Sequence, residues 1–143
     1  SSEGTLFLLF MAVLMSHEES PSTFALDNVD SALNPALTRQ LLETIIEVTI
    51  EHKESPELGP EQVFLTSHNP TALDAFDLFD DDQRVFVVSR GDKGHTQIER
   101  LKPRDGMSRE EWQHVFKGKK LSQLWIDGEI SGALGAKSVG PEI

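Results

Sequence analysis

The sequence predicts an α/β fold in which helices cover a parallel sheet. Two short apolar runs, residues 23–26 and 62–66, have the length of buried strands, and each ends in polar residues. Two longer segments, residues 4–16 and 35–52, have the apolar content or the spacing of helices. Because strand and helix alternate, continuing to a third strand at 85–89, the strands are expected to run parallel. In such sheets the chemistry lies at the C-terminal tips of the strands.

Composition limits the classes of function. The chain of 143 residues is long enough for one domain with a single core. Its net charge of -11 argues against a broad nucleic-acid-binding surface on this segment. It has no cysteine, which excludes disulfides and thiolate metal sites and is compatible with the cytoplasm, where we expect the protein.

The first helix is expected over 4–16, with Ser2 or Thr5 as its cap. Its apolar run, 6–15, is too short to span a bilayer, and the acidic Glu3 replaces the basic flank of a signal peptide. A buried helix is the better interpretation. The abrupt apolar opening suggests a fragment of a longer protein.

The second helix is expected to begin at Asn34-Pro35, since proline suits the first turn. Its apolar positions recur at helical spacing out to about His52. A polar loop over 51–60 then leads to the second strand, and a short helix is expected over 70–76.

The remaining elements are predicted from turn and cap signals. Strands at 85–89 and 96–101 flank the turn 91–94 and form a hairpin. Ser108 and Glu111 form a capping box for a helix over 108–116. A last short helix is expected over 121–126, and the glycine-rich tail from Gly128 is expected to be loose.

The strand tips carry Asp27-Asn28 and Ser67-His68. A carboxylate at the end of a buried strand needs a partner, and magnesium on a phosphate is one. Taken alone, Asp27 is better explained as the cap of the following turn or helix. His68, taken alone, is better explained as a satisfied histidine at a sheet edge. The two at neighbouring tips are more informative together.

Three motifs in order then resemble the second half of the ABC-type ATPases, in the branch of the SMC proteins and the OLD-like AAA ATPases. Residues 1–6, Ser-Ser-Glu-Gly-Thr-Leu, resemble the ABC signature at the start of a helix. Residues 24–35 resemble the Walker B strand and the D-loop, and residues 65–70, Leu-Thr-Ser-His-Asn-Pro, resemble the switch-histidine strand. The resemblance implies a P-loop NTPase core over 1–101, with a hairpin at its end and a helical extension over 102–143.

The resemblance also implies roles for single residues. Asp27 would hold Mg²⁺, position 28 would be the general base, and His68 would contact the γ-phosphate and the water. The signature residues would grip ATP bound to a second subunit from a helix N-terminus, where free N–H groups bind anions; they are Ser2, Glu3, Gly4 and Thr5. Ser31 and Asn34 would lie in the D-loop across the subunit interface.

Two departures from the pattern matter. Asn28 stands where glutamate is usual, and an amide orients a water without taking its proton. Loss of a general base typically slows a reaction by about 10²–10⁴-fold, so we expect slow hydrolysis. No Gly-x-x-x-x-Gly-Lys-Ser/Thr run is present in the sequence. The phosphate-binding loop is therefore expected on an N-terminal half outside these residues or on another chain.

The function expected from the resemblance is ATP binding and hydrolysis between subunits, in a bacterial anti-phage defence ATPase that controls an effector nuclease. The segment 125–129, Trp-Ile-Asp-Gly-Glu, is similar to that group, including the ATPase of PARIS-type systems. Two alternatives stay open: an ATP-dependent scaffold that does not hydrolyse, and a DNA-repair ATPase of the same branch.

Several other residues favour an ordinary structural role. The run Asp80-Asp81-Asp82 lacks the spacing of a calcium loop and is expected to be a solvated turn. Trp112 and Trp125 are expected to pack the last helices, and the basic run 117–120 is expected to be a solvated face. The remaining histidines show no metal-ligand spacing: His17, His52, His95 and His114.

Overall fold

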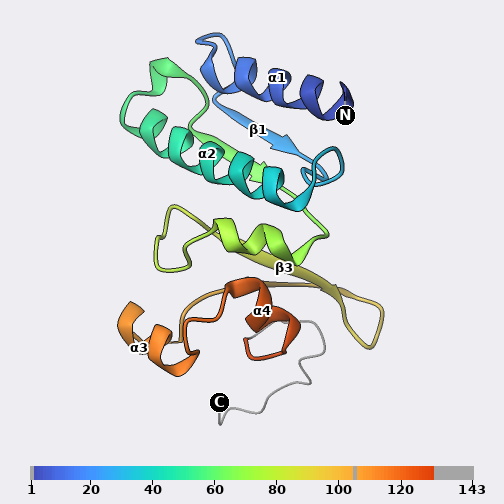
Figure 1. The fold of residues 1–143 in the computed structure, drawn as a ribbon, viewed down its shortest axis with the longest axis vertical. Coiled ribbons are helices and arrows are strands. Elements are labelled where there is room, and N and C mark those ends of the chain that lie inside the picture. The colour runs from blue at the N-terminus through green and yellow to red at the C-terminus, as the bar shows by residue number, and fades with distance from the viewer. Residues whose placement is uncertain (1, 105, 131–143) are drawn as a thin grey trace. The chain divides into compact units, whose positions relative to one another are not determined.

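The structure is a computed structural model that describes residues 2–104 and 106–130. The chain divides into two compact units, residues 1–75 and 76–143, whose elements are drawn in Figure 1. The boundary expected after Leu101 lies inside the second unit. Most of the predicted loose tail, residues 131–143, lies outside the described residues.

Unit 1 is built on a two-stranded parallel sheet. Its elements are α1 (Ser2–Ser16), β1 (Thr23–Leu26), α2 (Pro35–Glu54), the 3₁₀ turn η1 (Pro56–Leu58), β2 (Gln62–Leu65) and the 3₁₀ turn η2 (Pro70–Ala75). β1 and β2 pair from Thr23 opposite Gln62 to Leu26 opposite Leu65. The parallel sheet predicted from the sequence is confirmed, and the segment predicted as a helix over 70–76 is a 3₁₀ helix.

The core of unit 1 lies between α1, α2 and one face of the sheet. Met11 and Met15 of α1 pack with Ile45 of α2. Partly buried side chains surround these three; they are Phe7, Leu14, Phe24, Leu26, Leu41, Val48, Val63 and Leu65. Since residues two apart in a strand share a face, the four strand residues in this set all lie on one side of the sheet. Both helices therefore cover the same face.

The opposite face and one side of α1 are open, which corrects the expectation of buried elements. Phe64 of β2 is 58% exposed, and neither strand is fully buried. α1 is apolar on nearly every side, and four of its large side chains are more than half exposed: Leu6, Leu9, Phe10 and Val13. Two helices packed on one face of a two-stranded sheet cannot cover an apolar helix on all sides.

The helix starts follow from local chemistry. The side chain of Asn34 accepts a hydrogen bond from Leu37 N at 2.9 Å, and Pro35 occupies the first turn of α2. α1 begins at Ser2, so Ser2 and Thr5 both lie within the helix and the predicted capping role is wrong for both. Its first turn carries Glu3, as the helix dipole favours.

A tight loop joins the ends of α1 and α2 to the start of β2. His52, 6% exposed, donates from Nδ1 to Pro60 O at 2.8 Å. Gly59 has a φ of 155°, and a Cβ there would lie 2.7 Å from His52 Cε1 and 2.8 Å from Met15 O. Position 59 therefore admits only glycine without a shift of its neighbours.

Unit 2 combines a hairpin with two short helices. Its elements are β3 (Val85–Arg90), β4 (Thr96–Leu101), α3 (Arg109–Val115) and α4 (Leu121–Ile126). The predicted hairpin and the Ser108–Glu111 capping box are both present. β3 pairs with β4 in a sheet of its own, so the third strand does not extend the parallel sheet as the alternation suggested.

Aromatic side chains hold α3 in unit 2. Trp112 contacts Phe79 edge-on at 6.0 Å and Phe116 at 4.5 Å between ring centroids. Leu101, Phe116 and Leu124 are buried in this unit. Trp112 thus has the packing role predicted from the sequence.

Candidate functional site

The C-terminal tips of β1 and β2 form one hydrogen-bonded edge. The hydroxyl of Thr66 donates to Asp27 Oδ1 and accepts from Asn28 N at 2.9 Å. The backbone pairing continues on both sides, since Thr66 N donates to Leu26 O at 3.0 Å and Val29 N donates to Thr66 O at 3.1 Å. Thr66 therefore fixes both the carboxylate of Asp27 and the backbone of position 28.

Thr66 was not among the residues that the sequence singled out for the site. The signal that would have found it is its position, since it is the first polar residue after the second apolar run. The two parallel strands pair Leu26 with Leu65, so Asp27, which follows the first strand, lies next to Thr66, which follows the second. A hydroxyl beside a carboxylate at adjacent strand tips predicts a hydrogen bond between them.

Asn28 has an unusual backbone and an unsatisfied amide. Its φ is 53°, in the left-handed region that asparagine tolerates better than most residues. Its Oδ1 is buried and has no hydrogen-bond partner among the described residues. A buried acceptor left unpaired costs about 1–3 kcal/mol, so this oxygen favours a water or ligand donor. That arrangement suits a residue that orients a water.

The segment after Asn28 is a folded turn. Ser31 N donates to Asn28 O at 3.0 Å, and Val29 is 2% exposed. Ser31 is exposed, as a D-loop residue at an interface would be. Asn34 is also exposed, but its Oδ1 caps α2, so this side chain already has a role in the helix start.

The first turn of α1 lies at the same end of unit 1 as the strand tips. In Figure 1 the arrow of β1 points toward the end of α1 that carries the chain terminus. Ser2, Glu3 and Thr5 are exposed there and Gly4 is buried. Ser1, the first residue of the signature-like run, lies outside the described residues. The dipole of the helix makes such a terminus attractive to anions.

His68 lies on a loop that its neighbours hold in place. Ser67 Oγ accepts from Asn69 N at 3.1 Å, and Asn69 Oδ1 accepts from both N and Oγ1 of Thr71 at 3.0 and 2.9 Å. His68 itself is exposed, three residues beyond the end of β2. The ring is therefore accessible to solvent on the loop that follows β2.

The oxygen donors at this edge suit magnesium held together with phosphates. Asp27 is exposed, and the unpaired Oδ1 of Asn28 follows it in the chain. Among residues 2–104 and 106–130, no group of three or more His, Cys, Asp or Glu side chains forms a metal site by itself. Mg²⁺ usually takes one or two carboxylates and completes its shell with water and substrate phosphates, so the donors fit that mode.

Residues 1–74 match the protein family described as an AAA domain, putative AbiEii toxin of a type IV toxin–antitoxin system. The chain belongs to this AAA domain family. The match covers unit 1, which ends at Ala75, and it agrees with the parallel sheet and its helices. The AAA domain is an ATPase-type, nucleotide-binding domain of the P-loop NTPase fold. No curated protein and no solved structure gives a significant match.

The membership gives the strand-tip edge its context, because the matched residues contain Asp27, Asn28, Thr66 and His68. Among the described residues, 2–104 and 106–130, no helix is long and apolar enough to cross a bilayer.

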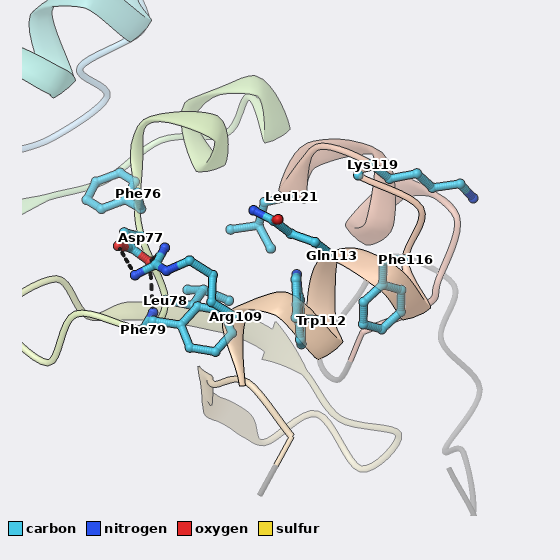
Figure 2. A pocket seen from close by; sticks show the side chains of 11 residues that line it. Phe76, Asp77, Leu78, Phe79, Arg109, Trp112, Gln113, Phe116, Lys119 and Leu121 are labelled. Carbon is cyan, nitrogen blue, oxygen red and sulfur yellow. Dashed lines mark hydrogen bonds and ion pairs between the residues drawn. The ribbon is translucent and has the colours of Figure 1, made fainter. Parts of the chain in front are cut away.

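Unit 2 has a groove of its own, shown in Figure 2, of about 270 Å³. Arg109 closes one wall by donating from Nη1 and Nη2 to the two carboxylate oxygens of Asp77, at 3.0 and 2.9 Å. These hydrogen bonds hold the pKa of Asp77 below its usual range, although its partial burial acts in the opposite direction. The groove lies outside the family match.

The acidic turn has the solvated structure that its spacing predicted. Asp80 Oδ1 accepts from Asp82 N at 2.9 Å, and Asp80 Oδ2 accepts from Gln83 Nε2 at 3.0 Å. Asp81 pairs with Arg100 at 3.3 Å and is 97% exposed. The carboxylate of Asp80 thus stabilises the turn, and that of Asp81 stabilises its junction with the hairpin.

Proposed function

We propose that this chain supplies the strand-tip edge of an AAA-family ATPase that binds ATP between two subunits and hydrolyses it slowly. The observation that carries the proposal is the bridge from Thr66 to Asp27 and Asn28. It holds a carboxylate and an amide in fixed positions at the edge where parallel sheets place their chemistry. The family membership of residues 1–74 supports a nucleotide as the ligand.

Each residue at the edge has a proposed role. Asp27 would hold Mg²⁺, with Thr66 fixing its orientation. When bound, Mg²⁺ neutralises charge on the phosphates. The unpaired Oδ1 of Asn28 would accept a hydrogen bond from the attacking water and orient it. The exposed ring of His68 would donate to the terminal phosphate.

The first turn of α1 would contact ATP held mainly by the other subunit. Ser2, Glu3, Gly4 and Thr5 would present it with backbone N–H groups and hydroxyls. Ser31 would lie at the same interface. The phosphate-binding loop, which the 143 residues do not contain, would come from the rest of the full-length protein or from a partner chain.

The proposed setting is a cytoplasmic anti-phage defence complex in bacteria. ATP-dependent closure of the two ATPase subunits would control an effector such as a nuclease. The resemblance of residues 1–6, 24–35 and 65–70 to the OLD-like branch supports this setting. A loss of phage protection in cells on substitution of Asp27 by Ala would be its direct test.

Substitution of Asn28 tests the hydrolytic part of the proposal. In the full-length protein, Asn28→Asp places a carboxylate where the amide now lies, and Asn28→Glu places one a methylene group further out. Asp is the matched variant, because it tolerates the left-handed φ of this position better than Glu does. We expect steady-state ATP turnover to rise by about 10²-fold or more, the usual contribution of a general base.

A second candidate is an ATP-dependent scaffold, which the amide at position 28 favours. Light scattering with and without ATP distinguishes the two. If both carboxylate variants leave turnover at background while ATP still drives subunit association, the scaffold is the correct function and hydrolysis is not.

A further inference from the structure

The acidic charge of this chain is concentrated in one unit. Residues 1–75 carry 2 Lys or Arg and 12 Asp or Glu, a net charge of -10. Residues 76–143 carry 11 Lys or Arg and 12 Asp or Glu, a net charge of -1. Within unit 2 the segment 84–104, which contains the hairpin, carries 6 basic and 2 acidic side chains. The total charge of the chain therefore conceals a basic element.

One face of the hairpin combines these charges with exposed apolar side chains. Residues two apart in a strand share a face, and the register pairs Phe86 with Arg100 and Val88 with Ile98. The face then ends in Arg90 opposite Thr96. Phe86, Val88 and Ile98 are 55%, 65% and 68% exposed. No acidic residue lies on this face over the two strands.

The other face of the hairpin is the covered one. Leu101 is 3% exposed, and Val85 and Val87 are half-buried. Phe86, Val88 and Ile98 are thus the large apolar residues that the two strands of the hairpin leave in solvent. Figure 1 shows the turn end of the hairpin extending beyond the helices of unit 2.

Arg100 lies at the end of the face away from the turn, opposite Phe86, and is already ion-paired. Its Nη2 pairs with Asp81 at 3.3 Å, while its Nε is buried and has no partner among the described residues. Arg90, at the other end, is exposed. Arg100 lies opposite position 86, which is four residues from Arg90 in the same strand. The backbone positions of the two arginines are therefore about 13 Å apart along the strands.

We propose that this hairpin face, made by Phe86, Val88, Arg90, Ile98 and Arg100, binds single-stranded nucleic acid. The exposed guanidinium of Arg90 at one end matches a phosphate of such a strand, and the exposed ring of Phe86 at the other end, opposite Arg100, matches an unstacked base. The apolar residues lie on the flat middle of the sheet, whereas the turn contains Asp92. This placement favours stacking of bases on the face. Insertion into a lipid layer would instead require the acidic turn of the hairpin to enter the layer first. The inference does not rest on ATP hydrolysis.

Fluorescence anisotropy with a labelled single-stranded oligonucleotide tests the proposal in the full-length protein without ATP. We expect binding that weakens as salt rises. Phe86→Ala should weaken it by about 5-fold to 100-fold, the loss expected for one stacked base. Arg90→Gln should weaken binding at low salt and reduce the slope of log affinity against log salt by about one phosphate contact.

Arg39→Gln is the matched control, because Arg39 is a basic residue of α2 in the acidic unit and its loss changes the net charge equally. It should leave the affinity unchanged. Thermal unfolding of each variant shows that the fold is retained, since Phe86 and Arg90 are exposed.

Three results would overturn the proposal. The first is no oligonucleotide binding at low salt, or binding that Phe86→Ala and Arg90→Gln leave intact. The second is sedimentation with vesicles of anionic phospholipid that needs these residues, without oligonucleotide binding. The third is concentration-dependent self-association that Phe86→Ala abolishes, again without oligonucleotide binding, which would assign the face to a second copy of the chain.

Discussion

At the scale of single residues, Thr66 connects the two strand tips through one hydroxyl. The same oxygen donates to Asp27 and accepts from Asn28 N, so it fixes a side chain and a backbone together. A hydroxyl is the smallest group that does both, since it is at once a donor and an acceptor. Thr66 is accordingly a positioning residue in the proposed site.

We expect Thr66→Val to weaken Mg²⁺-dependent ATP binding by about tenfold, because each lost hydrogen bond to a charged group contributes about 1.5–3 kcal/mol. Thr66→Ser should restore most of the affinity, since it keeps the hydroxyl. Titration of ATP at several Mg²⁺ concentrations in the full-length protein is the measurement. Thr71→Val removes a hydroxyl from the neighbouring loop and serves as control; an equal loss in that variant would refute the specific role of Thr66.

Asp77 gives unit 2 a predictable response to acid. Two hydrogen bonds from Arg109 are the main reason that its pKa is lowered from 3.8. A carboxyl whose pKa is lower in the folded state favours folding above its unfolded pKa, and this contribution is lost as pH falls through the folded value. Stability should therefore drop below about pH 4.

Urea unfolding followed by tryptophan fluorescence at pH 5 and pH 3 measures that drop. Asp77→Asn should make the difference between the two pH values smaller, because the neutral amide does not titrate. Asp92→Asn, on the hairpin turn, should leave the difference as in the parent protein. A difference that persists in Asp77→Asn would assign the acid response to other carboxyl groups.

At the scale of elements, the start of α2 is the best-defined signal in the chain. Asn34 caps the helix and Pro35 occupies its first turn, as the dipeptide predicted. Asn34→Ala should destabilise unit 1 by about 0.5–2 kcal/mol in chemical unfolding, whereas Asn34→Ser should cost little. Equal stability of the Ala variant and the parent would contradict the cap. If Asn34→Ser instead impairs ATP-driven association while folding normally, the amide also acts at the interface.

The sequence predicted most elements to within a residue or two, and the reasons are local. Short apolar runs, the Gly91–Gly94 turn and the Ser108–Glu111 box each determine their own structure within a few residues. The hairpin partner of β3 was predicted, but β3 does not join the parallel sheet, because pairing of distant strands depends on packing and not on the strand itself. Burial was overestimated for α1 because an apolar composition does not say which neighbours are present.

The candidate site was predicted in part for a similar reason. Asp27 and Asn28 follow one apolar run and His68 follows the next, so their common edge was foreseeable from strand order. The bridge through Thr66, the left-handed φ of Asn28 and its unpaired Oδ1 depend on how the strands align, and a linear pattern does not carry that information.

At the scale of the whole molecule, the exposed side of α1 should control how this chain behaves in solution. Leu9 and Phe10 are 61% and 53% exposed, beside the buried Met11. Contiguous exposed apolar side chains promote association. We expect Leu9→Gln with Phe10→Gln to lower the self-association of the 143-residue chain in analytical ultracentrifugation. Met11→Gln should instead lower its stability, and unchanged association in the double variant would contradict the role of this side.

The loop around Gly59 offers a way to weaken unit 1 far from the strand tips. His52, which would meet a Cβ at position 59, lies 17 residues along α2 from Pro35, or roughly 25 Å at 1.5 Å per residue. Gly59→Ala would strain this loop without altering any group at the proposed site. In genetic terms it is a candidate temperature-sensitive allele: cells would keep the activity at low temperature and lose it on warming.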